Sequence, residues 1–486
     1  MRKLVINAYN RIARIDPKIY GNFSEHLGRC IYNGIYVGEN SPIPNVNGMR
    51  TDLVEALKKM KLPFLRWPGG CFADEYHWKD GIGPKESRKT IVNTNWGGVT
   101  ETNAFGTHEF LELCRQVGCE PYICGNVGSG TVQELSEWVE YMNFDGVSPM
   151  ADLRRKNGQD EPWRIKYLAV GNESWGCGGR MTAERYAEEF LRYANFCRSY
   201  PGAPLFKVAC GPSSGDAHWT DVLMEKAGKD MDGIALHHYC YDTDDWNDKG
   251  PALGFGSAQW YSLLKSAYRM EEMVSLHSAI MDRWDPQRRV ALLVDEWGAW
   301  YAVEPGTNPA FLYQQNTVRD ALVAGLTLNI FNKHAQRVRG ANIAQLINVL
   351  QSVALTDGEK VCLTPTYHVF EMYKEHQGGE LLESFIQQEE VEGIPDVTES
   401  VSVGEDGAIF VTLCNLTLDK TVPVDAVLVG AAPKSAEAYI VTGEPDGHNT
   451  FDQPENITKR PYTAALTHGG FTVTLPPRSV VSVRLW

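Results

Sequence analysis

Two glutamates in this sequence stand where short apolar runs end, each close to a second polar residue. Glu173 comes shortly after the apolar run 167–170, with Asn172 directly before it, and Glu296 follows the run 290–294. Glycoside hydrolysis needs two carboxyl groups that face each other across a cleft. One of them donates a proton to the departing sugar oxygen, while the other is ionised and attacks or stabilises the anomeric carbon. The two glutamates therefore indicate this chemistry, provided that the fold brings them together.

A single glutamate at a strand end is more often solvated or salt-bridged than catalytic, so the surrounding elements decide the matter. Short apolar runs alternate with segments of helical period from about residue 19 to about residue 375. The expected strands are 20–23, 63–67, 121–124, 165–170, 206–209, 233–237, 290–294 and 342–348. The expected helices lie near 51–60, 107–117, 132–142, 183–198, 217–227, 260–280, 309–334 and 366–375. Eight such units, with strands that are apolar on both faces, predict a (β/α)8 TIM barrel. An open doubly wound sheet is the competing interpretation.

In a barrel of this kind, the carboxyl ends of all eight strands meet at one mouth. The polar and thiol residues that follow the apolar runs are Asn22, Glu25, Arg66, Cys71, Asn126, Asn172, Glu173, His237, His238, Tyr239, Asp295, Glu296 and Gln351. We expect them to surround one cavity, with Glu173 and Glu296 on opposite sides.

Several candidate residues also have a purely structural interpretation. Cys71 follows Pro-Gly-Gly, and it lies either at the mouth or in the core as a small buried hydrophobe. Trp96, Trp175 and Trp300 either stack on a sugar or anchor their loops. His237 taken alone is better explained as a hydrogen-bonded core histidine than as a ligand-binding group.

The pattern changes after about residue 377. Alternating apolar and polar residues, separated by turn residues, predict strands at 399–403, 408–416, 421–429, 436–441 and 471–485. This second domain is expected to be an all-β, jelly-roll-type sandwich. We place an N-terminal strand that joins the sandwich in residues 1–18, the catalytic barrel in 19–377 and the sandwich in 378–486.

Composition narrows the function classes. The 486 residues include 46 basic and 61 acidic side chains, and the net charge of −15 argues against nucleic-acid binding. No stretch approaches the length of a membrane span, and no signal peptide is visible. The 11 cysteines are odd in number and contain no CxxC pair, and the histidines show no metal-binding spacing. We therefore expect a cytoplasmic protein with reduced cysteines, no disulfide framework, no metal and no cofactor.

The motifs around these residues closely resemble those of the α-L-arabinofuranosidases of glycoside hydrolase family 51. The matching segments include GNFSEHLGRCIYNGIYVG, RWPGGCFADEYHWKDGIGP, AVGNESWGCGG, LVDEWG and ANIAQLINVLQS, in this order between about residues 21 and 377. The resemblance implies a barrel with a jelly-roll-type sandwich, hydrolysis by double displacement with retention, and an intracellular homo-oligomer, often a hexamer.

The resemblance also implies roles for individual residues. Glu173 matches the general acid/base and Glu296 the nucleophile. Asn172 matches the residue that holds the sugar hydroxyl next to the anomeric carbon, and Arg66 and Tyr239 match residues beside the nucleophile. The other matched substrate-site positions are Glu25, Cys71, Trp96, Trp175, His237, Trp300 and Gln351. In the triplet 237–239, many relatives have tyrosine where His238 stands.

These observations predict a retaining, exo-acting α-L-arabinofuranosidase that releases terminal arabinofuranose from arabino- and arabinoxylo-oligosaccharides. An endo-β-1,4-glucanase or a β-xylosidase of the same family is the nearest alternative. A non-catalytic carbohydrate-binding relative is a further alternative, and the presence of both Glu173 and Glu296 argues against it.

Overall fold

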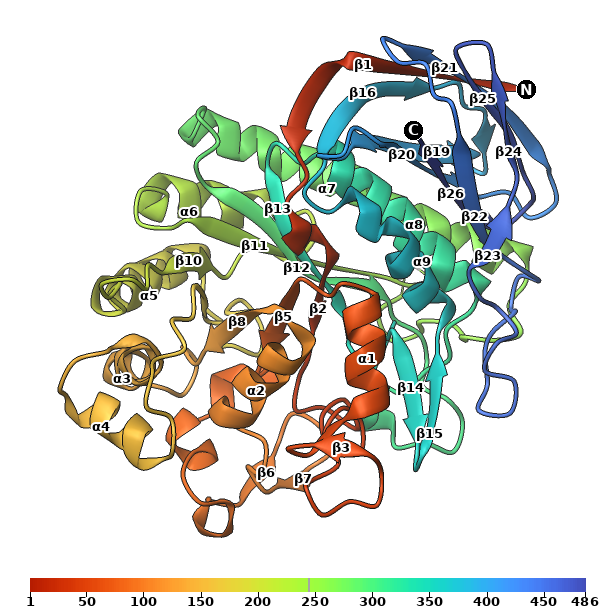
Figure 1. Ribbon diagram of the computed structural model, residues 1–486. Coiled ribbons are helices and arrows are strands. Elements are labelled where there is room, and N and C mark those ends of the chain that lie inside the picture. Colours follow the sequence, from red (N-terminus) through yellow and green to blue (C-terminus); the bar gives the residue numbers. More distant parts are fainter. Residues whose placement is uncertain (244) are drawn as a thin grey trace.

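A closed barrel of eight parallel strands forms the larger part of the molecule, in a computed structural model that describes residues 1–243 and 245–486 (Figure 1). Its strands are β2 (Gly21–Phe23), β5 (Phe64–Trp67), β8 (Glu120–Gly125), β9 (Tyr167–Val170), β10 (Phe206–Ala209), β11 (Gly233–Cys240), β12 (Ala291–Ala299) and β13 (Val338–Ala344). Each strand pairs with the next, and β13 closes the barrel onto β2. The barrel prediction is confirmed, and the open doubly wound sheet is excluded.

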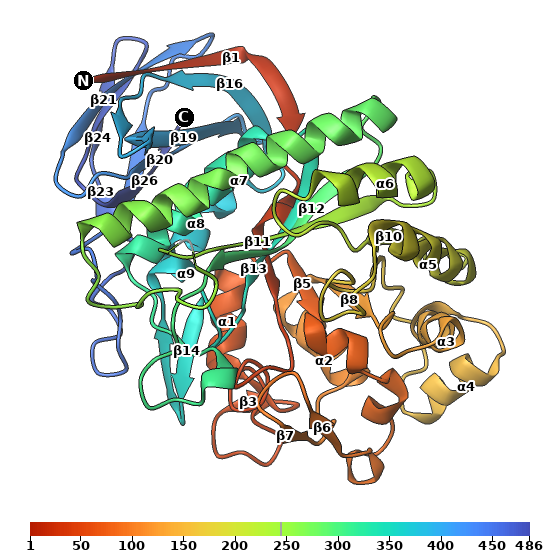
Figure 2. The ribbon, with the colours of Figure 1, turned by 180° about the vertical axis from the view of Figure 1, so that it is seen from behind.

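The helices surround the barrel, as expected for strands that are apolar on both faces (Figures 1 and 2). They are α1 (Thr51–Lys59), α2 (Thr107–Val117), α3 (Val132–Asn143), α4 (Pro149–Lys156), α5 (Ala183–Phe196), α6 (Ala217–Ala227), α7 (Ser257–Trp284), α8 (Val318–Lys333) and α9 (Pro365–Tyr373). The short helix α4 is absent from the sequence prediction, although Ser148 caps it and Pro149 begins it. No helix in the described ranges combines the length and the hydrophobicity that a membrane crossing requires.

The last barrel strand lies earlier in the sequence than predicted. The expected range was 342–348, but β13 ends at Ala344, and residues 345–350 follow as an irregular loop. Most of this segment is buried and apolar, so its composition resembles that of a strand. The difference decides which glutamine of this segment reaches the cavity.

The remaining elements are short. Two-residue to four-residue strands form the hairpins β3 (Asn45–Val46) with β4 (Met49–Arg50), β6 (Ile91–Asn93) with β7 (Val99–Glu101), β14 (Ala354–Asp357) with β15 (Lys360–Leu363), and β17 (Glu390–Val391) with β18 (Ile394–Pro395). Short 3-10 helices are η1 (Pro17–Tyr20), η2 (Cys71–Glu75), η3 (Trp78–Gly81), η4 (Lys85–Ser87), η5 (Pro309–Phe311) and η6 (Lys374–His376).

The second domain is a ten-stranded sheet that curls into a sandwich around its own apolar core (Figure 1). Its order is β23 (Arg460–Tyr462), β22 (Ala436–Thr442), β26 (Ser479–Leu485), β20 (Ile409–Asn415), β19 (Val397–Val403), β16 (Glu380–Ile386), β1 (Arg2–Arg14), β21 (Val422–Val429), β25 (Gly470–Leu475) and β24 (Ala464–Thr467). Strand β1 is the first strand of the chain, but it lies between β16 and β21, which come much later in the sequence. In β21, buried residues alternate with more exposed ones, which is typical of a strand with one face on the core.

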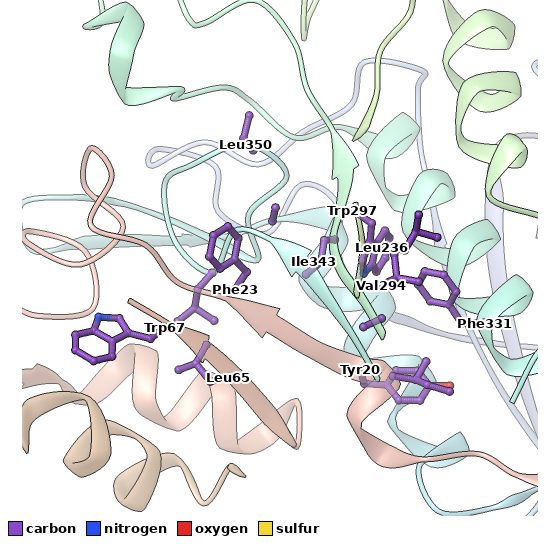
Figure 3. Packing of buried hydrophobic residues seen from close by; sticks show 14 of the residues in the cluster. Tyr20, Phe23, Leu65, Trp67, Leu236, Val294, Trp297, Phe331, Ile343 and Leu350 are labelled. Atoms are coloured by element: carbon purple, nitrogen blue, oxygen red, sulfur yellow. The ribbon is translucent and has the colours of Figure 1, made fainter. Parts of the chain in front are cut away.

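Helix α8 joins the two domains. All of its residues except Lys333 are buried, because it lies between the barrel and the sheet (Figure 2). Figure 3 shows Phe331 of this helix beside Trp297 of β12, with their ring centroids 5.4 Å apart. On the other side, the Asn332 amide donates to Ser400 in β19 at 3.0 Å.

Candidate active site

A cavity of about 570 Å³ opens at the carboxyl ends of the barrel strands. The predicted site residues that line it are Glu25, Cys71, Trp96, Glu173, Trp175, His237, Tyr239, Glu296 and Trp300. Arg66 and Asn172 lie directly behind this lining and are almost completely buried. The fold thus brings together residues from across the first 300 positions of the chain.

Glu296 is held by two hydrogen bonds from opposite sides. Arg66 Nη1 donates to Oε1 at 2.8 Å, and the Tyr239 hydroxyl donates to Oε2 at 2.7 Å. Burial by itself raises the pKa of Glu296, but the nearby His237 and Arg66 and the two hydrogen bonds outweigh burial and lower the pKa below its ordinary value. This carboxyl group is therefore set up to be ionised.

Strand geometry explains why two consecutive acids reach the barrel interior. On β12, the pairing register shifts between Leu293 and Glu296 against β11 and between Val294 and Trp297 against β13. Arg66 consequently lies 2.8 Å from the carboxylate of Glu296 and 3.8 Å from that of Asp295. In a regular strand, adjacent side chains point to opposite faces, and an irregularity in register redirects one of them.

Glu173 lies in a turn after β9, not within the strand. Its backbone φ is +40°, a left-handed conformation that is uncommon for a residue with a side chain. Arg66 Nη2 donates to Oδ1 of Asn172 at 2.5 Å, so a single guanidinium connects Asn172 to Glu296. The two glutamates look alike in the sequence, but they stand on different kinds of backbone.

Asp74, which is not among the residues predicted from the sequence, supports this turn. Its carboxylate accepts hydrogen bonds from the backbone N–H groups of Val127 at 3.0 Å, Gly128 at 2.9 Å and Asn172 at 3.1 Å. Burial raises the pKa of Asp74 to about 7. Asp74 lies several residues beyond the end of β5, so the pattern of polar residues at strand ends does not include it. It fixes the backbone immediately before Glu173.

His237 stands between the two glutamates. Its Nδ1 lies 3.0 Å from Oε1 of Glu173 and 3.6 Å from Oε2 of Glu296. Burial lowers the pKa of His237, but the charges of the two glutamates outweigh burial and raise it. One carboxylate oxygen of Glu173 and one of Glu296 lie within 4.8 Å of each other. Two carboxyl groups thus face each other across this cavity at close range.

Glu25 forms a second buried acidic centre in the cavity wall. Its Oε1 accepts from the Phe72 backbone at 3.0 Å and from Trp96 Nε1 at 2.9 Å, and its Oε2 accepts from Gln345 Nε2 at 3.0 Å. Burial raises the pKa of Glu25 to about 7. A Cβ atom on Gly70 would stand 2.9 Å from Oε1, so only glycine allows this close approach.

The structure does not place Gln351 at the cavity. Its side chain is completely buried, and its Nε2 donates to the backbone oxygen of Asp320 at 2.8 Å and to Thr366 at 3.1 Å. Gln345 lines the cavity instead. Because β13 ends at Ala344 and not at the expected 348, it is the earlier glutamine that meets the mouth.

Aromatic side chains form the rim. Trp96 and Trp175 are each fixed by an indole hydrogen bond, to Glu25 and to the Gly211 backbone oxygen respectively. Trp300 contacts Tyr239 edge-to-face, with ring centroids 5.0 Å apart, and Trp246 contacts Trp300 at 5.1 Å. Trp246, which is not among the residues predicted from the sequence, is about half exposed and lies in the loop between β11 and α7.

The structure corrects the expectation that the cysteines form no disulfide. Cys71, after β5, is bonded to Cys177, in the loop after β9. Their sulfur atoms lie 3.9 Å and 3.6 Å from Oε2 of Glu173. The other nine cysteines are free and buried. The two cysteines are 106 residues apart, so no local sequence pattern indicates that they pair. Only the folded barrel brings the ends of β5 and β9 to the same mouth.

In the part of the chain that the structure describes, two groups of side chains have metal-like spacing, each with candidate ligand atoms within 4.8 Å of one another. They are Cys71, Glu173 and Cys177, and Glu173, His237 and Glu296. Disulfide-bonded sulfurs lack the thiolate that binds metals. In the second group, the histidine lies in contact with both carboxylates, an arrangement that suits proton transfer between acids.

Comparison with known proteins identifies the family. A family model described as the α-L-arabinofuranosidase 1 domain matches residues 56–244, and one described as the α-L-arabinofuranosidase C-terminal domain matches residues 295–479. An intracellular exo-α-L-arabinofuranosidase of Bacteroides ovatus is 49% identical over 479 residues, which cover 97% of this chain and 93% of that protein.

Two crystal structures have the same fold over the whole chain. A glycoside hydrolase family 51 arabinofuranosidase from Xanthomonas axonopodis pv. citri has a TM-score of 0.98 and 44% identity, and the match covers 100% of this chain and 99% of that one. An α-L-arabinofuranosidase from Thermotoga maritima in an arabinose complex has a TM-score of 0.90 and 32% identity, with 100% and 99% coverage. The resemblance found in the sequence is thus confirmed: the chain is a glycoside hydrolase and belongs to the α-L-arabinofuranosidases of glycoside hydrolase family 51.

Proposed function

We propose that this protein is a retaining, exo-acting α-L-arabinofuranosidase in which Glu296 is the nucleophile and Glu173 the general acid/base. The observation that carries the proposal is the short separation of the two carboxylates, with oxygen atoms within 4.8 Å. Retaining glycosidases hold their carboxyl groups about 5–5.5 Å apart, whereas inverting enzymes leave room for a water at about 6.5–9.5 Å.

The first step uses the different environments of the two acids. Glu296, kept ionised by Arg66 and Tyr239, attacks the anomeric carbon with a carboxylate oxygen. The bond from that carbon to the leaving-group oxygen breaks, and Glu173 gives its proton to this oxygen. The products are a free alcohol and an arabinosyl ester on Glu296, with Glu173 now ionised.

The second step reverses the roles of Glu173. As a base, it removes a proton from water, and the water oxygen attacks the anomeric carbon from the face that the alcohol has left. The ester bond to Glu296 breaks, which restores its carboxylate, while Glu173 regains its proton. Two displacements at one carbon give net retention of configuration. His237 contacts both acids and compensates the negative charge as that charge passes from one acid to the other.

The inner wall of the cavity is suited to hold one furanose ring. Glu25 and Gln345 present polar groups next to Cys71 and Trp96, and Asn172 lies behind Glu173. Concave sites that combine apolar walls with a few fixed polar groups are typical of small-ligand binding. Release of a terminal arabinofuranose is also what the name of the Bacteroides ovatus relative implies for that protein.

The substrates that we propose are arabino- and arabinoxylo-oligosaccharides, hydrolysed without a metal or organic cofactor. A cytoplasmic location and assembly into hexamers stay predictions from the sequence and its resemblance. The Bacteroides ovatus relative is named intracellular, which supports the first of them.

Substitution of each glutamate tests the proposal. Glu296→Ala is expected to abolish turnover of an aryl α-L-arabinofuranoside. Glu173→Ala is expected to retain slow hydrolysis of substrates with good leaving groups, and azide is expected to restore turnover and give an arabinosyl azide of retained configuration. Unchanged turnover in Glu296→Ala, or failure of the azide rescue, would contradict the corresponding role. Parallel assays on β-1,4-glucan and aryl β-xyloside distinguish the endoglucanase and β-xylosidase alternatives.

A further inference from the structure

A second hollow continues from the catalytic cavity along α7. It has a volume of about 700 Å³, and four residues line both spaces: Tyr241, Thr243, Ser266 and Arg269. Its outer end reaches Glu392, in the turn of the β17–β18 hairpin of the second domain. We define the α7 groove by its lining residues Tyr241, Tyr261, Lys265, Ser266, Arg269 and Glu392. Because the two spaces share a wall, a chain that leaves the catalytic cavity on this side enters the groove.

The groove carries two cations that have no acidic partner in residues 1–243 and 245–486. Lys265 and Arg269 are exposed and stand four residues apart on α7, so they project from the same face of the helix. Among the described residues, no carboxylate lies within 4.0 Å of either cation. Like charges at this spacing destabilise a helix, and the chain as a whole carries a net charge of −15. Glu392 is the one acidic residue among the described residues that line the groove, so the two cations outnumber the acidic groups of that lining.

The floor of the groove is fixed against the second domain. The Trp260 indole donates to the Leu416 backbone oxygen at 3.0 Å, and the Tyr261 hydroxyl accepts from the Leu418 backbone at 3.1 Å. Tyr261 and Tyr241 offer aromatic surfaces on which sugar rings stack, and Ser266 offers a hydroxyl. From Arg269 to the start of the helix, this face extends about 18 Å at the usual rise of 1.5 Å per residue. It is therefore longer than a single sugar.

We propose that the α7 groove binds the leaving-group part of the substrate and that Lys265 and Arg269 select a uronic acid within it. This inference rests on the proposed function, because it names the glycan that is attached to the departing oxygen. A guanidinium binds a carboxylate through two parallel hydrogen bonds, and an ammonium one turn away adds a second charge. Neutral sugars gain only the stacking and hydroxyl contacts.

A matched pair of substrates tests this selectivity. One is an arabinoxylo-oligosaccharide with a glucuronic acid on the leaving-group side, and the other is the same compound with that carboxyl group reduced to an alcohol. The wild-type protein is expected to have a kcat/KM about fivefold to tenfold higher for the acidic compound, and this preference shrinks at 0.5 M NaCl as salt screens the charges. In Lys265→Ala/Arg269→Ala the ratio of the two kcat/KM values is expected to fall to about one.

The control is Lys226→Ala/Lys229→Ala, which removes two exposed lysines at and after the end of α6 that line neither space. Its acid-to-neutral ratio is expected to equal that of the wild type. Equal rates on both compounds in the wild type, or a preserved preference in Lys265→Ala/Arg269→Ala, overturn the inference. An aryl α-L-arabinofuranoside, which has no sugar in the groove, separates the two levels. If the protein hydrolyses this compound but shows no preference between the two oligosaccharides, the inference about the groove is wrong and the proposed function stands. If it does not hydrolyse this compound, the proposed function is wrong as well.

Discussion

At the scale of single residues, the site assigns different tasks to chemically identical groups through their neighbours. Glu296, Glu25 and Asp74 are all buried carboxyls, but only Glu296 has a cationic side chain as a hydrogen-bond donor. The pKa of Glu296 is lowered, whereas burial raises the pKa values of Glu25 and Asp74 to about 7. Local donors and charges, not depth of burial, therefore determine which acid is ionised.

Removal of the Tyr239 hydroxyl tests this account. Tyr239→Phe deletes a hydrogen bond to the ionised form of Glu296, so the pKa of Glu296 is expected to rise. The acidic limb of the kcat/KM profile then moves to higher pH, and kcat/KM falls about tenfold at its optimum. The measurement is a pH–rate profile on an aryl arabinofuranoside, with Tyr200→Phe as a control away from the cavity. An acidic limb at its wild-type position contradicts the prediction.

Glu25 is expected to make stability depend on pH. Its pKa is raised in the folded protein to about 7, so between about pH 4.5 and pH 7 the folded state binds a proton that the unfolded state has lost. The contribution of Glu25 to stability is therefore greatest at low pH and is lost as the pH rises through this window. In Glu25→Gln this contribution is absent. The free energy of unfolding of the variant minus that of the wild type should thus increase from pH 5 to pH 8, on the order of 2 kcal/mol.

Urea unfolding of both proteins at pH 5 and at pH 8 measures this difference directly. A difference between variant and wild type that stays constant across the two pH values would show that Glu25 does not titrate in this range.

At the scale of elements, the position of Glu173 depends on two loops that a disulfide connects. Glu173 has a left-handed backbone conformation, Asp74 holds the residue before it, and the Cys71–Cys177 bond joins its loop to the segment after β5. The loop contains Gly176, Gly178 and Gly179, so it has little stiffness of its own. The crosslink and the Asp74 hydrogen bonds restrict it.

Breaking this disulfide is expected to lower activity and stability together. Cys177→Ser should reduce kcat about threefold to tenfold, because Glu173 loses part of its fixed position, and should reduce the free energy of unfolding by roughly 2–4 kcal/mol. Treatment of the wild type with dithiothreitol should have the same effect reversibly, since Cys177 is exposed. Thiol titration of the native protein measures how much of this disulfide has been reduced, because the nine other cysteines are buried.

Cys177→Ser itself is the control for the reductant and should not respond to dithiothreitol. Full activity of the wild type after two additional thiols have appeared would contradict the positioning role of the disulfide.

At the scale of the whole molecule, the barrel and the sandwich share elements. Strand β1 begins the chain but lies inside the sheet of the second domain, and α8 is buried between the two domains. The Asn329 side chain of α8 donates to Thr398 at 3.2 Å and accepts from Ser400 at 3.1 Å and Thr412 at 2.8 Å. A shared buried helix of this kind couples the unfolding of both domains.

We therefore expect one cooperative unfolding transition in calorimetry. Asn329→Ala leaves buried hydroxyls of the sheet without partners and is expected to lower the free energy of unfolding by about 1–3 kcal/mol, moving the single transition to lower temperature. Asn40→Ala, at an exposed position in a loop before α1, is the control and should leave the midpoint unchanged. Two separate transitions in Asn329→Ala would show that the domains unfold independently.

The sequence predicted the barrel strands and most of the helices because these elements depend on local periodicity. It also located Glu173 and Glu296, since the ends of parallel strands meet at one edge whatever the details of packing. The prediction failed for β13, whose apolar composition continues into the loop that contains Gln345. It also missed Asp74 and Trp246, which lie several residues beyond the ends of β5 and β11 and carry no periodic signal.

The sequence by itself thus determined the architecture, the family and the two carboxylates, because repeating apolar patterns and long motifs are properties of the chain read locally. Only the tertiary structure decided that Gln345 and not Gln351 meets the cavity, that Cys71 is bonded to Cys177, and that the groove along α7 continues the site. Each of these depends on residues far apart in the chain, and their positions are fixed when the barrel closes and the second domain docks against it.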